Sequence, residues 1–205
     1  MGEPKGLLNF SGRPWLLEQL TRFQGAGGEQ AVLVLGYHAN DYFQKIPGLL
    51  DSVQEPIRQW GLELATVINA YPEGGQFTSL CCAFTAPFIK AAPGAFILPI
   101  DVPSPGMAVY EILAAALAGP AWVVIPRFQS RGGHPVLLAA TFIRQLLRLA
   151  AETEGTRLDV EIQKLSPERT VRPEVSDPQV RMNLNLPADF EDYSLLRQGN
   201  ASGGA

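Results

Sequence analysis

The sequence predicts an α/β fold, a three-layer α/β/α sandwich around a mainly parallel sheet. Two observations support this prediction. Short apolar runs rich in β-branched residues alternate along the chain with longer segments in which apolar residues recur at helical spacing. The short runs are continuously apolar, as strands must be when helices cover both faces of their sheet. Because strands and helices alternate, right-handed crossovers would place helices on both sides of the sheet.

Four apolar runs are predicted strands, and six segments are predicted helices. The strands are residues 31–35, 64–69, 95–100 and 121–125. The helices are residues 14–24, 51–60, 78–90, 106–118, 137–152 and 156–165. Pro14 suits the first turn of the first helix, where its missing N–H needs no partner, and Leu16 and Leu20 lie on one apolar stripe.

A single domain is expected over residues 1–195, followed by a flexible tail over residues 196–205. The chain has 205 residues, of which 46% are hydrophobic, and this is enough to bury one core. Residues 198–205 read QGNASGGA and are too small and polar to pack against that core.

Composition and charge argue against several classes of partner. The net charge is −4 and no basic run occurs, so a nucleic-acid polymer is not expected as a partner. No apolar stretch approaches the roughly 20 residues of a membrane helix, and the opening MGEPKGLLNF is unlike a secretion signal. Cys81 and Cys82 are adjacent, and since neighbouring cysteines rarely pair, both are interpreted as small core residues. We therefore expect a cytoplasmic protein that makes no membrane contact.

Asp101 is the sharpest single signal for chemistry. Ligands of such sheets bind beyond the carboxyl ends of the strands, and Asp101 directly follows the apolar run 95–100. A carboxylate in this position is costly without a partner. A helix N-cap is the alternative, but Ser104 is better placed to cap the next helix. Asp101 is therefore interpreted as a metal ligand or active-site carboxylate. Mg²⁺ fits, because it takes few protein carboxylates and completes its shell with water and phosphate oxygens.

Two loops beyond other strands supply further candidates. After 64–69, the loop that contains Asn69 and Gly74 leads to Ser79 at a predicted helix start, where backbone amides could hold a phosphate or ribose. A purely structural turn would explain these residues equally well. His134 stands between Gly133 and a proline, outside any helix or strand, which favours a site histidine over a core one. His38 has no such neighbours and is interpreted as a surface residue.

Six segments, taken in order, carry a family resemblance. They read MGEPKGLL at 1–8, GRPWLLEQL at 12–20, N…G…SL at 69–80, IDVPSP at 100–105, RGGHPVLL at 131–138 and NLNLPADF at 183–190. Together they resemble the molybdenum-cofactor nucleotidyltransferase-like (MobA-like NTP transferase) family, from residue 1 to about 193. The resemblance implies a Rossmann-like sheet of the nucleotide-diphospho-sugar transferase type.

The resemblance also implies an enzyme and a site. The implied reaction is Mg²⁺-dependent attack of a small phosphorylated acceptor, molybdopterin cofactor, on the α-phosphate of CTP or GTP, with release of pyrophosphate. The implied roles are as follows: Lys5 and Asp101 catalytic; Lys5, Asn69, Gly74 and Ser79 nucleotide-binding; Gly133 and His134 acceptor-binding; Asp101, Asn183 and Asn185 metal-binding. Phosphoryl chemistry needs charge neutralisation and alignment more than a strong base, which agrees with this set.

The sequence departs from the family pattern in two places. The late motif reads Leu186-Pro187-Ala188-Asp189 where the family normally has Thr-Pro-Glu-Asp. The family also opens with an apolar strand and an L-A-x-G-x-x-x-R loop before M-G-x-x-K, whereas this sequence begins at that methionine. We therefore expect a sheet without that first, central strand. Either the strands at 31–35 and 95–100 close the gap directly, or a neighbouring chain fills it in a homodimer.

Two other functions stay open at this point. One is a truncated, non-catalytic member of the family that acts as a binding or interaction protein, and it leaves open whether the sequence beginning at Met1 is active. The other is a nucleotidyltransferase whose acceptor is a sugar phosphate or methylerythritol phosphate. The GGHPVLL segment at 132–138 favours the molybdopterin acceptor.

Overall fold

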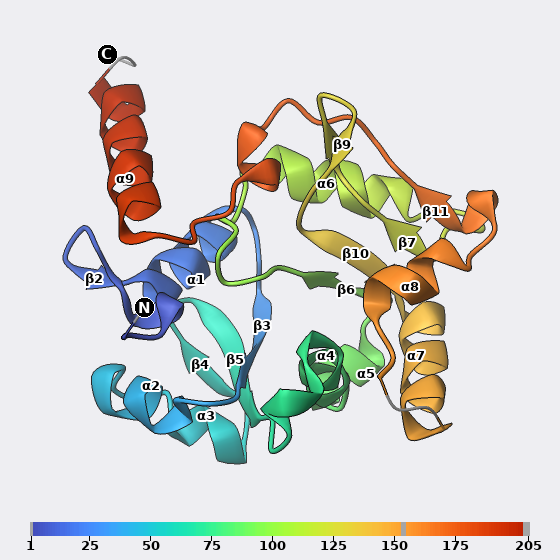
Figure 1. Cartoon of the computed structure of the whole chain (residues 1–205), viewed down its shortest axis with the longest axis horizontal. Coiled ribbons are helices and arrows are strands. Elements are labelled where there is room, and N and C mark those ends of the chain that lie inside the picture. The colour runs from blue at the N-terminus through green and yellow to red at the C-terminus, as the bar shows by residue number, and fades with distance from the viewer. Residues whose placement is uncertain (1, 153–154, 203–205) are drawn as a thin grey trace.

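Two mixed sheets form the middle of the protein in the computed structural model, which describes residues 2–152 and 155–202 (Figure 1). One sheet has the order β3 (Gln30–Leu35), β5 (Leu62–Ile68), β4 (Ile57–Gln59). The other has the order β11 (Thr170–Val171), β7 (Val123–Val124), β10 (Val136–Ala139), β6 (Gly94–Ile97). Two small hairpins pair β1 (Asn9–Phe10) with β2 (Arg13–Pro14), and β8 (Arg127–Phe128) with β9 (Arg131–Gly132).

Helices and single 3₁₀ turns connect these strands. The helices are α1 (Trp15–Gly25), α2 (Ala39–Lys45), α3 (Asp51–Gln54), α4 (Gln76–Phe84), α5 (Pro87–Ala91), α6 (Met107–Ala116), α7 (Ala140–Glu152), α8 (Leu158–Gln163) and α9 (Pro187–Ser202). The 3₁₀ turns are η1 (Lys5–Leu7), η2 (Pro72–Gly74), η3 (Pro167–Arg169) and η4 (Pro178–Arg181). Within the described part of the chain, no helix is long and apolar enough to cross a membrane.

Helices cover both faces of the β6–β10–β7–β11 sheet. Leu138 of β10 packs with Phe142 of α7, whereas its neighbour Leu137 packs with Leu113 of α6. Successive side chains of a strand point to opposite faces, so α7 and α6 lie on opposite sides of this sheet, as Figure 1 shows. This burial on both faces explains why the strand sequences are continuously apolar. The α/β class predicted from the sequence is confirmed.

The sheets are mixed rather than mainly parallel. β3 pairs with β5 in parallel, and β11 with β7, but β10 runs antiparallel to both of its neighbours. The predicted helix 137–152 therefore divides into the strand β10 and the helix α7, because the sheet buries Leu137 and Leu138. The predicted helix 51–60 likewise ends early, at α3, and β4 returns into β5 through a turn in which Gly61 has φ +77°.

The two sheets meet through a helix and not through strands. β3 is the edge strand of one sheet and β6 of the other, and within the described residues they do not pair with each other. The direct closure considered for 31–35 and 95–100 is therefore wrong. Helix α4 spans the junction, since it contacts β3, β5 and α7 and buries Phe77 and Phe84 in the core of the second sheet. Completion by a neighbouring chain, as in a homodimer, stays a prediction.

An aromatic cluster fastens the start of α9 to α1. Trp15 is fully buried, and its ring meets Phe190 edge-on with centroids 5.3 Å apart. Tyr193 and Phe10 complete the cluster, at 5.9 Å and 5.0 Å from Trp15. α9 then projects from the body as the red helix of Figure 1. Residues 196–202 are thus helical, and 203–205 lie outside the described residues; the 1–195 domain and the flexible 196–205 tail stay predictions.

Candidate active site

Three side chains from distant parts of the chain meet at one point. Nζ of Lys5 donates to Oδ2 of Asp101 at 2.9 Å and to Oδ1 of Asn185 at 2.7 Å. The side chains of Lys5 and Asp101 keep 28% and 25% of their surface exposed, so a ligand can reach them. The structure therefore joins two charged groups and an amide that the sequence assigned to one site. We name this group the Lys5 cluster: Lys5, Asp101 and Asn185.

Short local structures hold each member of the Lys5 cluster. Lys5 begins η1, in which the N–H of Leu7 donates to the carbonyl of Pro4 at 2.9 Å, and buried Leu7 anchors the turn in the core. Asp101 lies in the loop after β6. Its backbone carbonyl accepts the N–H of Leu184 at 2.7 Å. This bond brings the segment that carries Asn185 alongside Asp101.

Asp189 supports the Lys5 cluster, and the sequence reasoning assigned it no role. Its Oδ2 accepts the backbone N–H groups of Asn185 and Leu186, both at 2.7 Å. The carboxylate thus reaches back from the first turn of α9 and satisfies N–H groups at the helix start, as the acidic residue of a capping box does. An aspartate two residues after Pro187, at the start of a helix, is the sequence signal that could have identified it. Asp189 therefore holds the backbone at Asn185.

His134 lies on the same rim as Asp101. β10 begins two residues after His134, and its first residue, Val136, pairs with Ile97 at the end of β6. Burial lowers the pKa of His134, while a hydrogen bond to the backbone of Ile97 and the negative charge of Asp101 oppose this shift. Nδ1 of His134 is buried and has no hydrogen-bond partner among the described residues. The imidazole is therefore favoured in its neutral form.

A side chain at position 133 would collide with η4, so glycine is required there. A Cβ at this position would lie 2.1 Å from the carbonyl oxygen of Val180 in η4, far inside van der Waals contact. The adjacent N–H of His134 donates to the same carbonyl at 2.8 Å. Gly133 thus lets η4 approach the loop that presents His134.

The predicted nucleotide loop forms a second group at the carboxyl end of β5. The amide of Asn69, which is 3% exposed, donates to Oγ1 of Thr78 at 2.9 Å and to Oγ of Ser79 at 3.0 Å. Its Oδ1 accepts the N–H of Tyr71 at 2.9 Å. A Cβ on Gly74 would lie 2.6 Å from Cγ2 of Thr78. These contacts fasten the loop to α4, and direct contact of Asn69, Gly74 or Ser79 with a nucleotide stays a prediction.

Asn183 is not one of the side chains that Lys5 bonds among the described residues. Its side chain is exposed and lines a small hollow together with Asp192 and Leu196 of α9. Asn185, two residues on, is the asparagine that meets Lys5. The metal-binding role predicted for Asn183 stays a prediction.

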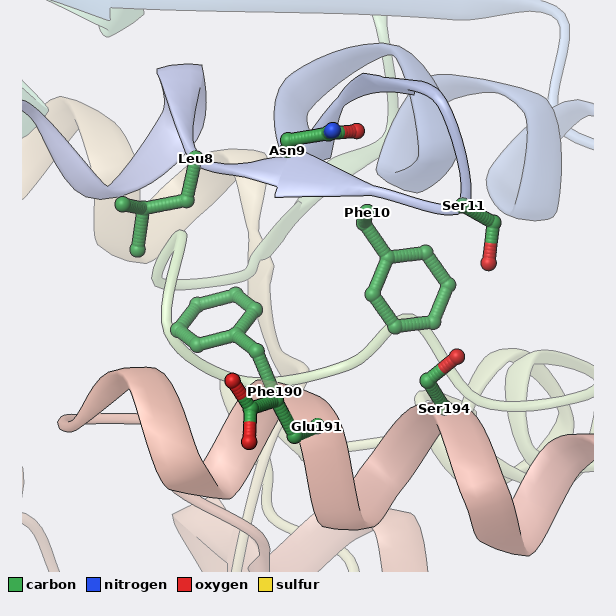
Figure 2. A pocket seen from close by; sticks show the side chains of 7 residues that line it. All are labelled: Leu8, Asn9, Phe10, Ser11, Phe190, Glu191 and Ser194. Atoms are coloured by element: carbon green, nitrogen blue, oxygen red, sulfur yellow. The ribbon is translucent and has the colours of Figure 1, made fainter.

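A cleft of about 230 Å³ lies between the β1–β2 hairpin and α9 (Figure 2). Figure 2 shows the rings of Phe10 and Phe190 pointing toward one another across it. Ser11 and Ser194 lie at one end of the cleft. The two segments that line the cleft come a few residues after Lys5 and after Asn185 in the sequence. No member of the Lys5 cluster is among the lining residues.

The Lys5 cluster offers donors that suit a divalent cation. Among the described residues, no group of three or more His, Cys, Asp or Glu side chains could hold a metal ion by itself. Oδ2 of Asp101 and Oδ1 of Asn185, however, converge on one ammonium. Both are hard oxygen donors, and Mg²⁺ needs only one or two such groups when phosphate oxygens complete its shell. The residues fit a metal ion that binds together with a phosphorylated substrate.

A comparison with protein families decides the assignment. The family described as the MobA-like NTP transferase domain matches residues 1–165. The chain belongs to this family. Membership makes it a nucleotidyltransferase, a divalent-metal-dependent class that binds nucleoside triphosphates and phosphorylated acceptors. The family resemblance drawn from the sequence is confirmed, and the enzyme is favoured over a non-catalytic binding protein.

Solved structures share the fold of this family member. Molybdopterin-guanine dinucleotide biosynthesis protein A from Archaeoglobus fulgidus is 18% identical, with a TM-score of 0.61 over 97% of this chain and 92% of that one. The 2-C-methyl-D-erythritol 4-phosphate cytidylyltransferase of Thermus thermophilus is 16% identical, with a TM-score of 0.63 over 96% and 95%. Rv0371C of Mycobacterium tuberculosis, in complex with manganese, is 19% identical, with a TM-score of 0.62 over 93% and 91%. A comparison with curated proteins found no match.

Proposed function

We propose that this nucleotidyltransferase transfers a nucleoside monophosphate from CTP or GTP to molybdopterin cofactor and uses Mg²⁺. An oxygen of the acceptor's phosphate attacks the α-phosphorus, the bond from that phosphorus to the β-phosphate oxygen breaks, and pyrophosphate leaves. The observation that supports this reaction is the meeting of Lys5, Asp101 and Asn185 within hydrogen-bond distance. Such chemistry depends on placing opposite charges around the phosphates.

Lys5 would bind the triphosphate directly. An ammonium has three N–H donors, and Lys5 uses two of them on Asp101 and Asn185. The third remains for a phosphate oxygen, in a position that the other two bonds set. Lys5 would therefore hold the triphosphate in a defined orientation as well as supply charge.

Asp101 and Asn185 would hold the metal ion. When bound, Mg²⁺ supplies positive charge to the triphosphate and to the pyrophosphate that leaves. Asp101 contributes the protein's negative charge at this point, and Asn185 contributes a neutral oxygen from a residue whose backbone N–H is bonded to Asp189. Because Asp101 is only a quarter exposed, its carboxylate has few alternative positions.

The acceptor would lie on the side of His134 and Gly133. His134 lies at the same edge of the sheet as Asp101. Because its neutral form is favoured, it would contact a negatively charged acceptor without forming a tight ion pair. The loop at Asn69, Gly74 and Ser79 would face the nucleotide from the end of β5. The choice of molybdopterin rests on the RGGHPVLL segment that contains His134.

Binding and product release test this proposal together. The protein is titrated calorimetrically with CTP and GTP, with and without Mg²⁺, and pyrophosphate release is followed after molybdopterin is added. We expect Mg²⁺-dependent binding of one nucleotide and release of pyrophosphate only with the acceptor. A sugar phosphate and methylerythritol phosphate serve as alternative acceptors. Release with either of these and not with molybdopterin would overturn the acceptor assignment, and metal-independent binding would overturn the site.

A further inference from the structure

One face of α1 is hydrogen-bonded to the loop that carries Asp101. Trp15, Gln19 and Arg22 are spaced four and three residues apart, so they lie on one stripe of the helix. Each donates to a backbone carbonyl of the loop 100–104. Nε1 of Trp15 bonds Ile100 at 2.6 Å, Nε2 of Gln19 bonds Val102 at 2.5 Å, and Nη2 of Arg22 bonds Ser104 at 2.6 Å. Asp101 is thus bracketed on both sides by residues bonded to α1.

Gln19 makes the middle one of these three contacts between α1 and the loop. Its Oε1 also accepts the N–H of Ser104 at 2.8 Å, so one amide satisfies two backbone groups on either side of Pro103. Gln19 is 6% exposed, Val102 1% and Ser104 0%. Water therefore cannot replace the lost bonds easily, and unpaired backbone groups at this depth are costly. Gln19 thus helps, with Trp15 and Arg22, to fix the position of this loop.

The other side of the loop touches the segment that carries Asn185. The carbonyl of Asp101 accepts the N–H of Leu184, and Arg22 extends from Ser104 to the side chains of Gln179 and Tyr193. η1, which contains Lys5, also packs on α1. Helix α1 thus contacts both the loop that carries Asp101 and the turn that carries Lys5. Among its three loop contacts, Gln19 is the one that bonds both the residue after Asp101 and the N–H of Ser104.

We propose that Gln19 is a positioning residue for Asp101. It touches no reacting group; it sets where the Asp101 carboxylate stands and so determines how tightly the site holds a divalent cation with its nucleotide. This inference rests on the proposed function, because the metal is the one that accompanies the triphosphate. Residues that hydrogen-bond metal ligands hold those ligands in place, and their loss weakens metal affinity about 10- to 100-fold. Gln19 would act in the same way, through two backbone groups beside the carboxylate that binds the metal.

The test replaces Gln19 by methionine, which has a similar length but neither bonds Val102 nor accepts from Ser104. Mn²⁺ is the probe, and electron paramagnetic resonance measures free Mn²⁺ in the presence of whichever nucleotide the unaltered protein binds. We expect Gln19→Met to raise the Mn²⁺ dissociation constant about 10- to 100-fold. The Mg²⁺ concentration for half-maximal turnover should rise likewise, with the KM for nucleotide at saturating Mg²⁺ unchanged. Gln24→Met, an exposed site on the same helix, is the matched control and should leave both values unchanged.

The outcomes separate the two proposals. If the unaltered protein binds Mn²⁺ with nucleotide and Gln19→Met binds it equally well, the positioning role is overturned while the proposed function stands. A thermal shift without a change in Mn²⁺ affinity would mean a structural role alone and would also overturn it. If the unaltered protein binds no Mn²⁺ with nucleotide, the proposed function fails and the role of Gln19 with it. Should Gln19→Met not fold, Gln19→Glu, which keeps an acceptor for Ser104, replaces it with the same expected weakening.

Discussion

Lys5 and Asp101, 96 positions apart in the chain, form an ion pair at 2.9 Å on the rim of the sheet. Both side chains keep about a quarter of their surface in solvent, which screens the pair. We therefore expect it to add only about 0–1 kcal/mol to stability, so stability does not explain it. We interpret the pair as two charged groups of a ligand site. Phosphates would attract the lysine, and a divalent cation would attract the carboxylate.

Asp101→Ala should abolish Mg²⁺-dependent pyrophosphate release while the protein stays folded. The substitution removes the protein's charged metal ligand, and losing several kcal/mol of metal-centred stabilisation lowers the rate on the order of 10³-fold or more. Steady-state kinetics measures the rate, and circular dichroism checks the fold. Asp51→Ala, an exposed aspartate at the start of α3, should behave like the unaltered protein. Unaltered turnover in Asp101→Ala would contradict the assignment.

Lys5→Ala should weaken triphosphate binding as well as turnover. A lysine contacts ground-state phosphates too, so its loss raises KM and lowers kcat together. Calorimetry with the nucleotide and steady-state kinetics give the two values separately. Lys164→Ala provides the control, since this exposed lysine pairs with Glu161 of α8. A fall in kcat with no change in nucleotide affinity would show that Lys5 acts on the transition state alone.

Asp189→Ala should destabilise the protein by about 1 kcal/mol, the usual effect of losing a helix-start hydrogen bond. It should also raise the Mg²⁺ requirement, because the backbone that carries Asn185 loses the bond that holds it in place. Urea unfolding and the Mg²⁺ dependence of turnover measure the two effects. Glu191→Ala, on the exposed surface of the same helix, is expected to show neither.

Gly133→Ala should destabilise the protein by about 1–3 kcal/mol through overpacking against η4. A methyl group cannot fit 2.1 Å from the carbonyl of Val180, so the loop or η4 must move. Urea unfolding measures the change. Gly106→Ala is the control, since a Cβ there has nothing within 4 Å and φ is −71°. Equal stability of the two variants would contradict this prediction, because it would mean that η4 moves away from the methyl group at little cost in free energy.

His134 should make stability fall with decreasing pH. Burial lowers its pKa below the ordinary value of 6.5, so the unfolded chain binds the proton more readily than the folded one. The stability contributed by the neutral ring is therefore complete above pH 6.5 and is lost as the pH falls through that value toward the folded pKa. Urea midpoints measured from about pH 8 to about pH 5 should show this loss, and His134→Gln should reduce it. His38→Gln should not, because that ring is exposed.

Much of the fold could be predicted because it depends on neighbours in the chain. Continuous apolar runs placed β3, β5, β6 and β7 correctly, and helical spacing identified α1, α6 and α8. The segment 137–152 was misassigned because Leu137 and Leu138 suit either a helix or a buried strand. Only pairing with β6 and β7 decides between them, and those strands lie elsewhere in the sequence.

The sequence by itself determined which chemistry the protein carries: a lysine, a carboxylate and an amide at the ends of segments that resemble one family. Only the tertiary structure decided which of these side chains meet. Asn185 reaches Lys5 across 180 positions because Leu184 bonds the backbone of Asp101, whereas Asn69 uses its amide on its own loop. Residue type and spacing specify what a side chain can bind. Which partner it has depends on how distant segments pack, and no local pattern contains that information.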